Sequence, residues 1–349
     1  MLGNKPLRGT TRRGTTPAGG GPDRGCGSID TMERVGDNQD FASLDLLRSA
    51  RRIGFVFSGG CSRCTFQIGV IETLAELGVR PSLCVGVSAG AWNAAAVAAG
   101  TSHRLRHYWR AFVRMPPLDL GNLLRERSPF RFVEMHRRTF PRYVGVHRLR
   151  SPGTLPLFIG VTRLRDRTAA CLDARTVEDP LELLLASNCL PPYYTRAPRI
   201  GGERYGDGGL TNNIPYEKAF EEGCDAVVLV TNKGESEGGL FRNPAEPMYE
   251  IPSPWQERTL VIRPRHRLPV AFTERHWPLL SQIVEIGRLR AREVLLGESH
   301  EAITDVRGEP PLAGLVFARL ARMQALGKTA KTAKGQLQTL LCRFESRDR

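Results

Sequence analysis

The sequence Gly-Val-Ser-Ala-Gly at residues 86–90 has the residue types and spacing of a nucleophile elbow. The apolar run 83–87 predicts a buried strand that ends at Ser88, and the alanine-rich segment 89–99 predicts a helix. A serine hydroxyl is a weak nucleophile, so this chemistry needs a sharp turn that exposes it beside a base. The helix N-terminus would favour a developing oxyanion. Taken alone, the motif also fits an ordinary strand-to-helix turn.

A glycine-rich turn at residues 58–64 precedes the elbow. The apolar segment 51–57 predicts a buried strand entering it, and apolar residues at helical spacing from Phe66 to Leu77 predict a helix leaving it. Backbone N–H groups in such a turn bind anions. The spacing matches neither nucleotide-binding glycine motif, so it fits an oxyanion hole better. Alternatively, Cys61 and Cys64 form a redox pair at a helix N-terminus.

The third candidate stretch is Asp207-Gly208-Gly209. An aspartate beside glycines is usually only a turn. Here a predicted helix precedes it and ends in the Leu-Pro-Pro loop at 190–192, while a helix at 216–222 and a buried strand at 226–230 are predicted to follow. This context gives the stretch more weight than an isolated turn would have.

In order, spacing and context these stretches resemble the patatin-like phospholipases, lipid acyl hydrolases with a serine–aspartate dyad, over residues 50–235. The matching pieces are the glycine-rich turn with Arg63, the helix start 66–70, the elbow 86–90, the loop 190–192, Asp207-Gly208-Gly209 and Asn-Asn-Ile-Pro at 212–215. The resemblance implies a three-layer α/β/α sandwich with a mainly parallel central sheet.

The resemblance also implies the roles of individual residues. Ser88 would be the nucleophile that forms an acyl-enzyme, and Asp207 would be its general base, with no histidine in the dyad. The oxyanion hole would consist of Gly59, Gly60 and Cys61, with Arg63 nearby. Support for the elbow and the dyad would come from Gly86, Gly90, Gly208 and Gly209. The implied substrate is a lipid or other acyl ester, and no metal or organic cofactor is implied.

Two features of the sequence keep alternative functions and mechanisms open. The family's turn usually reads Gly-Gly-Gly-x-Arg/Lys-Gly, and here cysteines 61 and 64 replace its third and last glycines. A side chain at position 61 would crowd the oxyanion hole, and losing one donor there costs about 3–4 kcal/mol. A catalytically weak protein that binds acyl chains or anionic membranes is therefore the second function class. His266, His276 and His300 follow Asp207 in the order of an ordinary triad, which is an alternative mechanism.

The chain of 349 residues carries a net charge of +14, which fits either an anionic partner or an arginine-rich surface that is simply solvated. Residues 101–150 hold twelve arginines against three acidic residues, and 315–349 hold eight basic residues against two. Interleaved apolar residues in 101–150 suit either transient contact with an anionic membrane surface or a helical cap facing the core. No nucleic-acid module is recognisable, which disfavours nucleic acid. Scattered cysteines and the lack of a signal or membrane-spanning pattern predict a cytoplasmic protein, with peripheral membrane contact.

The predicted organisation has three parts. Residues 1–50 read as a disordered leader, with a short helix beginning near Asp40. Residues 51–235 form the patatin-like catalytic core, including a basic helical cap at about 101–150. Residues 236–349 complete the domain with a strand at 260–262, a helix at 279–296 and short basic helices at 315–326 and 336–344. The sequence leaves the oligomeric state open.

Overall fold

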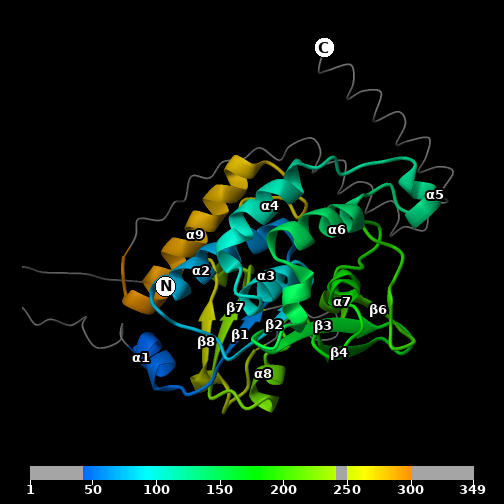
Figure 1. Ribbon diagram of the computed structural model, residues 1–349. Coiled ribbons are helices and arrows are strands. Elements are labelled where there is room, and N and C mark those ends of the chain that lie inside the picture. The colour runs from blue at the N-terminus through cyan, green and yellow to red at the C-terminus, as the bar shows by residue number, and fades with distance from the viewer. Residues whose placement is uncertain (1–41, 241–249, 300–349) are drawn as a thin grey trace, which may run out of the picture. The chain divides into compact units, whose positions relative to one another are not determined.

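The computed structural model describes residues 42–240 and 250–299 (Figure 1). The strands are β1 (Ile53–Phe57), β2 (Leu83–Val87), β3 (Leu157–Arg163), β4 (Thr168–Asp173), β5 (Arg199–Ile200), β6 (Glu203–Asp207), β7 (Ala226–Val230) and β8 (Thr259–Ile262). The α-helices are α1 (Ala42–Ser49), α2 (Thr65–Glu76), α3 (Ala89–Ala98), α4 (Leu105–Arg114), α5 (Asn122–Glu126), α6 (Phe132–Tyr143), α7 (Pro180–Ser187), α8 (Glu217–Glu221) and α9 (Trp277–Leu296). The helix expected near Asp40 corresponds to α1. The rest of the predicted leader and both predicted basic helices lie outside the described residues.

One sheet runs in the order β5-β6-β3-β2-β1-β7-β8, with β4 paired to β3. Its centre is parallel, because β3, β2, β1, β7 and β8 pair in the same direction, while β4, β5 and β6 pair antiparallel. Every residue of β1, β2 and β7 is buried. Continuous apolar strands of this kind are typical of a parallel sheet covered on both faces.

Two hydrophobic cores flank the sheet. The larger core packs α2, α3, α7 and α9 against one face, and the smaller one packs α8 and its neighbours against the other. Figure 1 shows α2, α3 and α9 on one side of the strands and α8 on the other. The predicted three-layer α/β/α sandwich with a mainly parallel sheet is confirmed.

The register on β3 brings two distant strand ends together. Gly160 pairs with Val87, the last residue of β2, and Val161 pairs with Asp207, the last residue of β6. Since β4 pairs along the whole of β3 from Phe158 onward, β2 and β6 share the opposite edge and meet end to end. The residue after β2 and the last residue of β6 are thereby neighbours, although 119 positions separate them in the chain.

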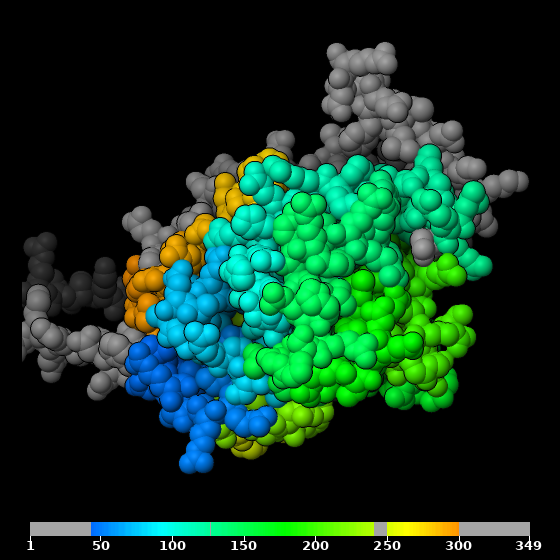
Figure 2. Space-filling view, viewed as in Figure 1, coloured from blue at the N-terminus to red at the C-terminus, as the bar shows by residue number. Residues whose placement is uncertain are grey.

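The segment 101–150 forms a cap of α4, α5 and α6, which lies at the surface of the face seen in Figure 2. Its aromatic residues Tyr108, Trp109, Phe112, Phe130 and Phe140 are buried. This packing agrees with the helical-cap interpretation. Leu120 and Leu124 differ, because their side chains are 53% and 92% exposed. Among the described helices, none combines the length and hydropathy that a membrane span requires.

The helix α2 begins directly after the glycine-rich turn, and its position is set by close packing against α9. A Cβ atom on Gly69 would lie 1.9 Å from the carbonyl oxygen of Val284, and one on Gly287 would lie 2.0 Å from that of Phe66. Only glycine fits at these positions, because the opposing atoms belong to helix backbone.

We expect Gly69→Ala to lower the free energy of unfolding by about 3 kcal/mol, since the methyl group would push the two helices apart. Gly153→Ala is the matched control, because a Cβ atom there meets nothing within 4 Å. The measurement is urea unfolding of both variants and the parent. Equal midpoints for the two variants would show that α2 and α9 do not pack this closely.

Candidate active site

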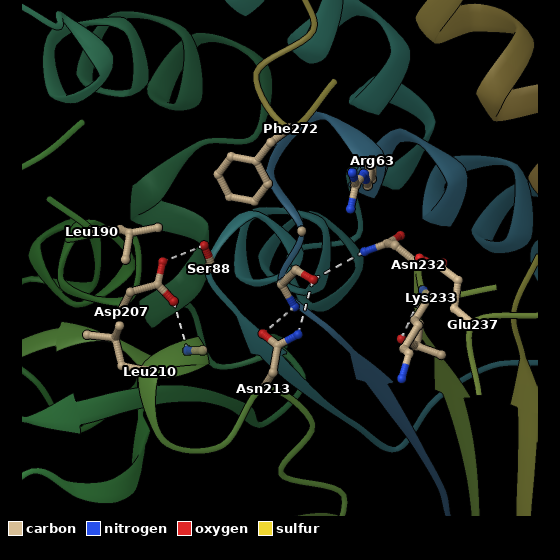
Figure 3. Close-up of a pocket in the computed structure, with 14 residues that line it drawn as sticks. Arg63, Ser88, Leu190, Asp207, Leu210, Asn213, Asn232, Lys233, Glu237 and Phe272 are labelled. Carbon is tan, nitrogen blue, oxygen red and sulfur yellow. Dashed lines mark hydrogen bonds between the residues drawn. The ribbon is translucent and has the colours of Figure 1, made fainter. Parts of the chain in front are cut away.

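Ser88 and Asp207 form a direct hydrogen bond at the meeting point of β2 and β6 (Figure 3). The Ser88 Oγ donates to the Asp207 Oδ2 over 2.7 Å. The other carboxylate oxygen, Oδ1, accepts from the Gly209 N–H at 2.8 Å. Both carboxylate oxygens are thereby held in place, and Oδ2 is the one that can receive the serine proton.

Ser88 has the strained backbone of a nucleophile elbow. Its φ of 52° and ψ of −128° lie where non-glycine residues are rare, so the turn must be held by its surroundings. The Ser88 N–H donates to the hydroxyl of Ser187, which in turn donates to the Gly160 carbonyl, both over 2.7 Å. Asn188 Nδ2 donates to the Ser88 carbonyl at 3.1 Å. These bonds from the end of α7 lock the elbow to β3.

Three of the four glycines predicted to support the elbow and the dyad lie at close backbone contacts, whereas a Cβ on the fourth, Gly209, would lie 3.1 Å from the side-chain oxygens of Asp207 and Asn213. A Cβ on Gly86 would lie 2.7 Å from the Cα of Ala91, and one on Gly90 would lie 2.4 Å from the Ser58 carbonyl. A Cβ on Gly208 would lie 2.4 Å from the Gly160 carbonyl. Side chains at these positions would separate the segments that form the site.

The Asp207 carboxyl is almost fully buried, with 4% of the residue exposed. Burial raises its pKa to about 6, and the hydrogen bonds from Ser88 and Gly209 oppose this rise. A carboxylate with such a pKa is ionised at neutral pH and is still basic enough to accept a proton near that pH.

Neither His266 nor His276 lines the cavities that touch Ser88 and Asp207. His266 and His276 are exposed, and His300 lies outside the described residues. The direct bond between Ser88 and Asp207 occupies the place where a triad histidine would stand.

The glycine-rich turn presents two unengaged donors. The Gly59 N–H, predicted for the oxyanion hole, instead donates to Asn213 Oδ1 at 3.0 Å, and Asn213 Nδ2 donates back to the Gly59 carbonyl at 3.2 Å. The Arg63 N–H donates to the Gly60 carbonyl at 3.2 Å. In the described part of the chain, the N–H groups of Gly60 and Cys61 have no acceptor. They are the donors of this turn that remain available to an anion.

Cys61 and Cys64 differ in backbone conformation. Cys61 has a φ of 52°, in the left-handed region that favours glycine, whereas Cys64 has a φ of −67° at the start of α2. Burial raises the pKa of the Cys61 thiol to about 11 and also raises that of Cys64 well above its usual range. Thiols of raised pKa are poor nucleophiles, which disfavours a redox role for the pair.

A polar cavity of about 510 Å³ opens on one side of the dyad. Figure 3 shows Arg63, Asn232, Lys233 and Glu237 on the side of this cavity away from Asp207. The Arg63 Nε is buried without an acceptor among the described residues. Burial and the nearby Arg267 lower the pKa of the Arg63 guanidinium. An anionic or hydroxyl-rich group bound here would supply the missing acceptor.

A second, narrow cavity of about 60 Å³ touches Ser88 from the apolar side. Its lining includes Cys61, Trp109, Phe112, Phe132, His136, Leu190, Tyr193 and Phe272. His136 stacks on Trp92 at 4.1 Å and on Phe112 at 4.4 Å, and its Nδ1 lies 2.8 Å from the Tyr108 hydroxyl. Burial lowers the pKa of His136 to about 3, so this imidazole is neutral and forms part of the cavity lining.

Several residues of the site were not anticipated from the sequence. Asn213 belongs to a recognised stretch, but no pattern indicated that its amide clamps Gly59. Asn232 Nδ2 likewise donates to the Gly59 carbonyl at 3.3 Å and to the Cys64 sulfur at 3.2 Å. His136 lies on a helix that carries no catalytic motif. Within the described residues, no cluster of His, Cys, Asp and Glu could hold a metal ion.

Comparison with known proteins gives a family match. Residues 55–220 match the family described as patatin-like phospholipase. Among solved structures, VipD from Legionella pneumophila is similar with a TM-score of 0.42 and 12% sequence identity, over 70% of this chain and 67% of that one. No curated protein matches the chain.

We expect Cys61→Gly to leave the free energy of unfolding unchanged or to raise it by up to about 1 kcal/mol, because glycine relieves the left-handed strain. Cys64→Gly should lower it by about 2 kcal/mol, since it removes a buried side chain from a right-handed conformation. Chemical denaturation of both variants measures the difference. Equal losses for the two would argue against a left-handed backbone at Cys61.

The raised pKa of Asp207 predicts that its charge destabilises the fold. Stability should fall as pH rises from the ordinary pKa of 3.8 to about 6, because the folded state then binds more protons than the unfolded state. Asp207→Asn removes this effect, so the stability of the variant relative to the parent should grow by about 2 kcal/mol between pH 4 and pH 7.5.

Asp173→Asn is the control with the opposite sign. Burial of Asp173 is outweighed by hydrogen bonds from Arg175, so the pKa of Asp173 is lowered and its charge stabilises the fold. Urea unfolding at both pH values measures the two differences. If the difference in stability between Asp207→Asn and the parent were the same at both pH values, burial of the Asp207 charge would be contradicted.

Proposed function

We propose that this chain, whose residues 55–220 match the patatin-like phospholipase family, hydrolyses acyl esters of lipids with Ser88 as nucleophile and Asp207 as base. The family supports lipid acyl hydrolysis in general. The observation that carries the specific proposal is the 2.7 Å bond from Ser88 Oγ to Asp207 Oδ2, on a strained elbow beside two unengaged N–H groups.

The first half-reaction transfers the acyl group to Ser88. Asp207 Oδ2 takes the hydroxyl proton while the Ser88 Oγ attacks the ester carbonyl carbon. The N–H groups of Gly60 and Cys61 bind the oxyanion of the tetrahedral intermediate. When the intermediate collapses, the bond to the alcohol breaks, and the leaving alkoxide takes the proton from Asp207.

The second half-reaction returns the enzyme to its starting state. Asp207 accepts a proton from water, and the resulting hydroxide attacks the acyl-enzyme carbonyl. Collapse then releases the carboxylic acid, and Ser88 regains its proton from Asp207. The two cavities suit the two parts of the ester. The apolar cavity takes the start of the acyl chain, and the polar cavity with Arg63 and Lys233 takes the alcohol part.

The second candidate is a catalytically weak protein that binds acyl chains, and Cys61 is the observation that favours it. Its side chain lines the apolar cavity beside Ser88, where the family usually has glycine. The two candidates make different demands on this residue. If the protein is a hydrolase whose cavity Cys61 constricts, removing the Cys61 side chain should raise the rate of hydrolysis. If the dyad is not catalytic, the same change should produce no activity.

The proposal includes a cytoplasmic location, as expected from the sequence. The six cysteines among the described residues are all free thiols. Unpaired cysteines support a reducing compartment.

We expect a fluorophosphonate probe to label the protein on Ser88, because its phosphorus captures an activated serine in place of the acyl carbon. Peptide mass mapping locates the label. Ser88→Ala should abolish labelling while the melting temperature stays nearly unchanged, and Cys61→Gly should label at least as fast as the parent. A folded parent protein that does not label would favour the second candidate.

The labelling rate should also depend on pH. Below about pH 6 it should fall about tenfold per pH unit, because protonated Asp207 cannot accept the serine proton. Ser187→Thr, which keeps a hydroxyl for the Ser88 N–H, should preserve this profile. If a histidine variant such as His276→Ala abolished labelling in a folded protein, the dyad assignment would be wrong.

A further inference from the structure

The segment 118–130, which we name the α5 excursion, leaves the cap between α4 and α6 and returns to it. Its ends pair through an antiparallel bridge between Leu118 and Phe130. The Asp119 N–H donates to the Pro129 carbonyl at 2.8 Å, and the buried Asn122 Nδ2 donates to the Phe130 carbonyl at 2.7 Å. Figure 1 shows α5 at the outer end of α4 and α6. The excursion is therefore closed by its own hydrogen bonds, and its conformation is fixed.

This fixed excursion exposes two leucines. Leu124 is 92% exposed and Leu120 is 53% exposed, the two highest values among the large apolar residues that the structure describes. The backbone turn between them is helical, since the N–H groups of Leu123 and Leu124 donate to the carbonyls of Leu120 and Gly121. Exposure of both leucine side chains to water is unfavourable, so a partner that covered them would be stabilised by the burial of apolar surface.

Arginines surround the base of the excursion. A surface hollow of about 440 Å³ is lined by Arg125, Arg131, Arg137 and Arg138, with Asp119 and Glu134 as its acidic members. Arg131 and Arg138 share the single carboxylate of Glu134, Arg125 pairs with Asp119, and Arg137 pairs with Glu182 of α7. Four guanidinium groups thus face three carboxylates, which leaves one positive charge in excess to complement an anionic surface.

The excursion is joined to the apolar cavity at the dyad. The Ser128 hydroxyl donates to the Pro192 carbonyl at 2.7 Å, and the Phe130 ring lies 5.1 Å from that of Tyr193. Tyr193 lies 6.2 Å from Phe272, and both rings line the cavity that touches Ser88. An unbroken row of aromatic contacts therefore runs from the excursion to the cavity.

From these observations we infer that the α5 excursion is the element by which the protein inserts into an anionic lipid bilayer. Leu120 and Leu124 enter the acyl boundary, and the arginines of the hollow bind headgroup phosphates. Two leucines form far too small an apolar patch for a stable protein interface, which buries about 800 Å² per partner. They suit binding to a membrane surface, where attraction between arginines and anionic headgroups adds to apolar insertion. The inference draws on the proposed function for the choice of lipid as partner, yet binding itself needs no turnover.

The test is vesicle binding by the full chain carrying Ser88→Ala, which separates binding from catalysis. The vesicles contain phosphatidylcholine alone or with about 30% phosphatidylserine. We expect binding to the anionic vesicles that weakens as salt rises, because headgroup attraction is screened. Adding Leu120→Ser and Leu124→Ser should weaken this binding about tenfold or more. Leu164→Ser is the matched control, since Leu164 is 39% exposed but lies outside the excursion.

A depth measurement makes the test independent of affinity. A Leu124→Trp variant should show stronger quenching by brominated lipid than the same protein without that substitution. Unchanged binding in the double leucine variant, binding that ignores lipid charge, or no extra quenching at position 124 would each overturn the inference. Loss of self-association in the double variant without vesicle binding would instead identify a second copy as the partner. Failure of Ser88 to label would overturn the proposed function and leave this result standing.

Discussion

The close packing of glycine backbone around Ser88 is the constraint on which the site depends. Gly90 lies against the Ser58 carbonyl, Gly208 lies against the Gly160 carbonyl, and Gly59 lies against the Ser88 Cβ, each closer than an added Cβ would allow. These contacts let the ends of β1, β2 and β6 converge. A methyl group at any of them would push the segments apart, and the 2.7 Å bond between Ser88 and Asp207 would lengthen or break.

The same packing sets the chemistry of the groups it brings together. Because Asp207 is enclosed, its pKa rises toward neutrality, which suits a base that must also release its proton. Because Asn213 and Asn232 clamp Gly59, the turn is fixed with the next two N–H groups unengaged. The site thus has two unengaged donors, a buried carboxyl and a serine on a strained turn, which are the groups that the proposed reaction requires, and neighbouring polar side chains hold them in place.

Local sequence patterns predicted the elements that carry their own signal. The succession of apolar strand, glycine turn and apolar or alanine-rich helix located β1, β2, α2 and α3 and placed Ser88 at the turn, because such signals act within a few residues. The helix at 279–296 was found for the same reason and corresponds to α9. Asp207 had a weaker local signal, since an aspartate beside glycines is usually a turn, and its proposed role came from a resemblance over many residues.

The sequence by itself therefore determined the strands and helices around the turns and the position of Ser88, because hydrophobic period and glycine placement are properties of neighbouring residues. The sandwich and the pairing of Ser88 with Asp207 were implied by the family resemblance. Only the tertiary structure decided that Gly59 gives its N–H to Asn213, that His136 forms a neutral wall of the apolar cavity, and that Gly69 packs against α9. Each of these depends on a partner more than 25 positions away in the chain. Such contacts are set by the register of β3 with β2 and β6 and by helix packing, which no local pattern encodes.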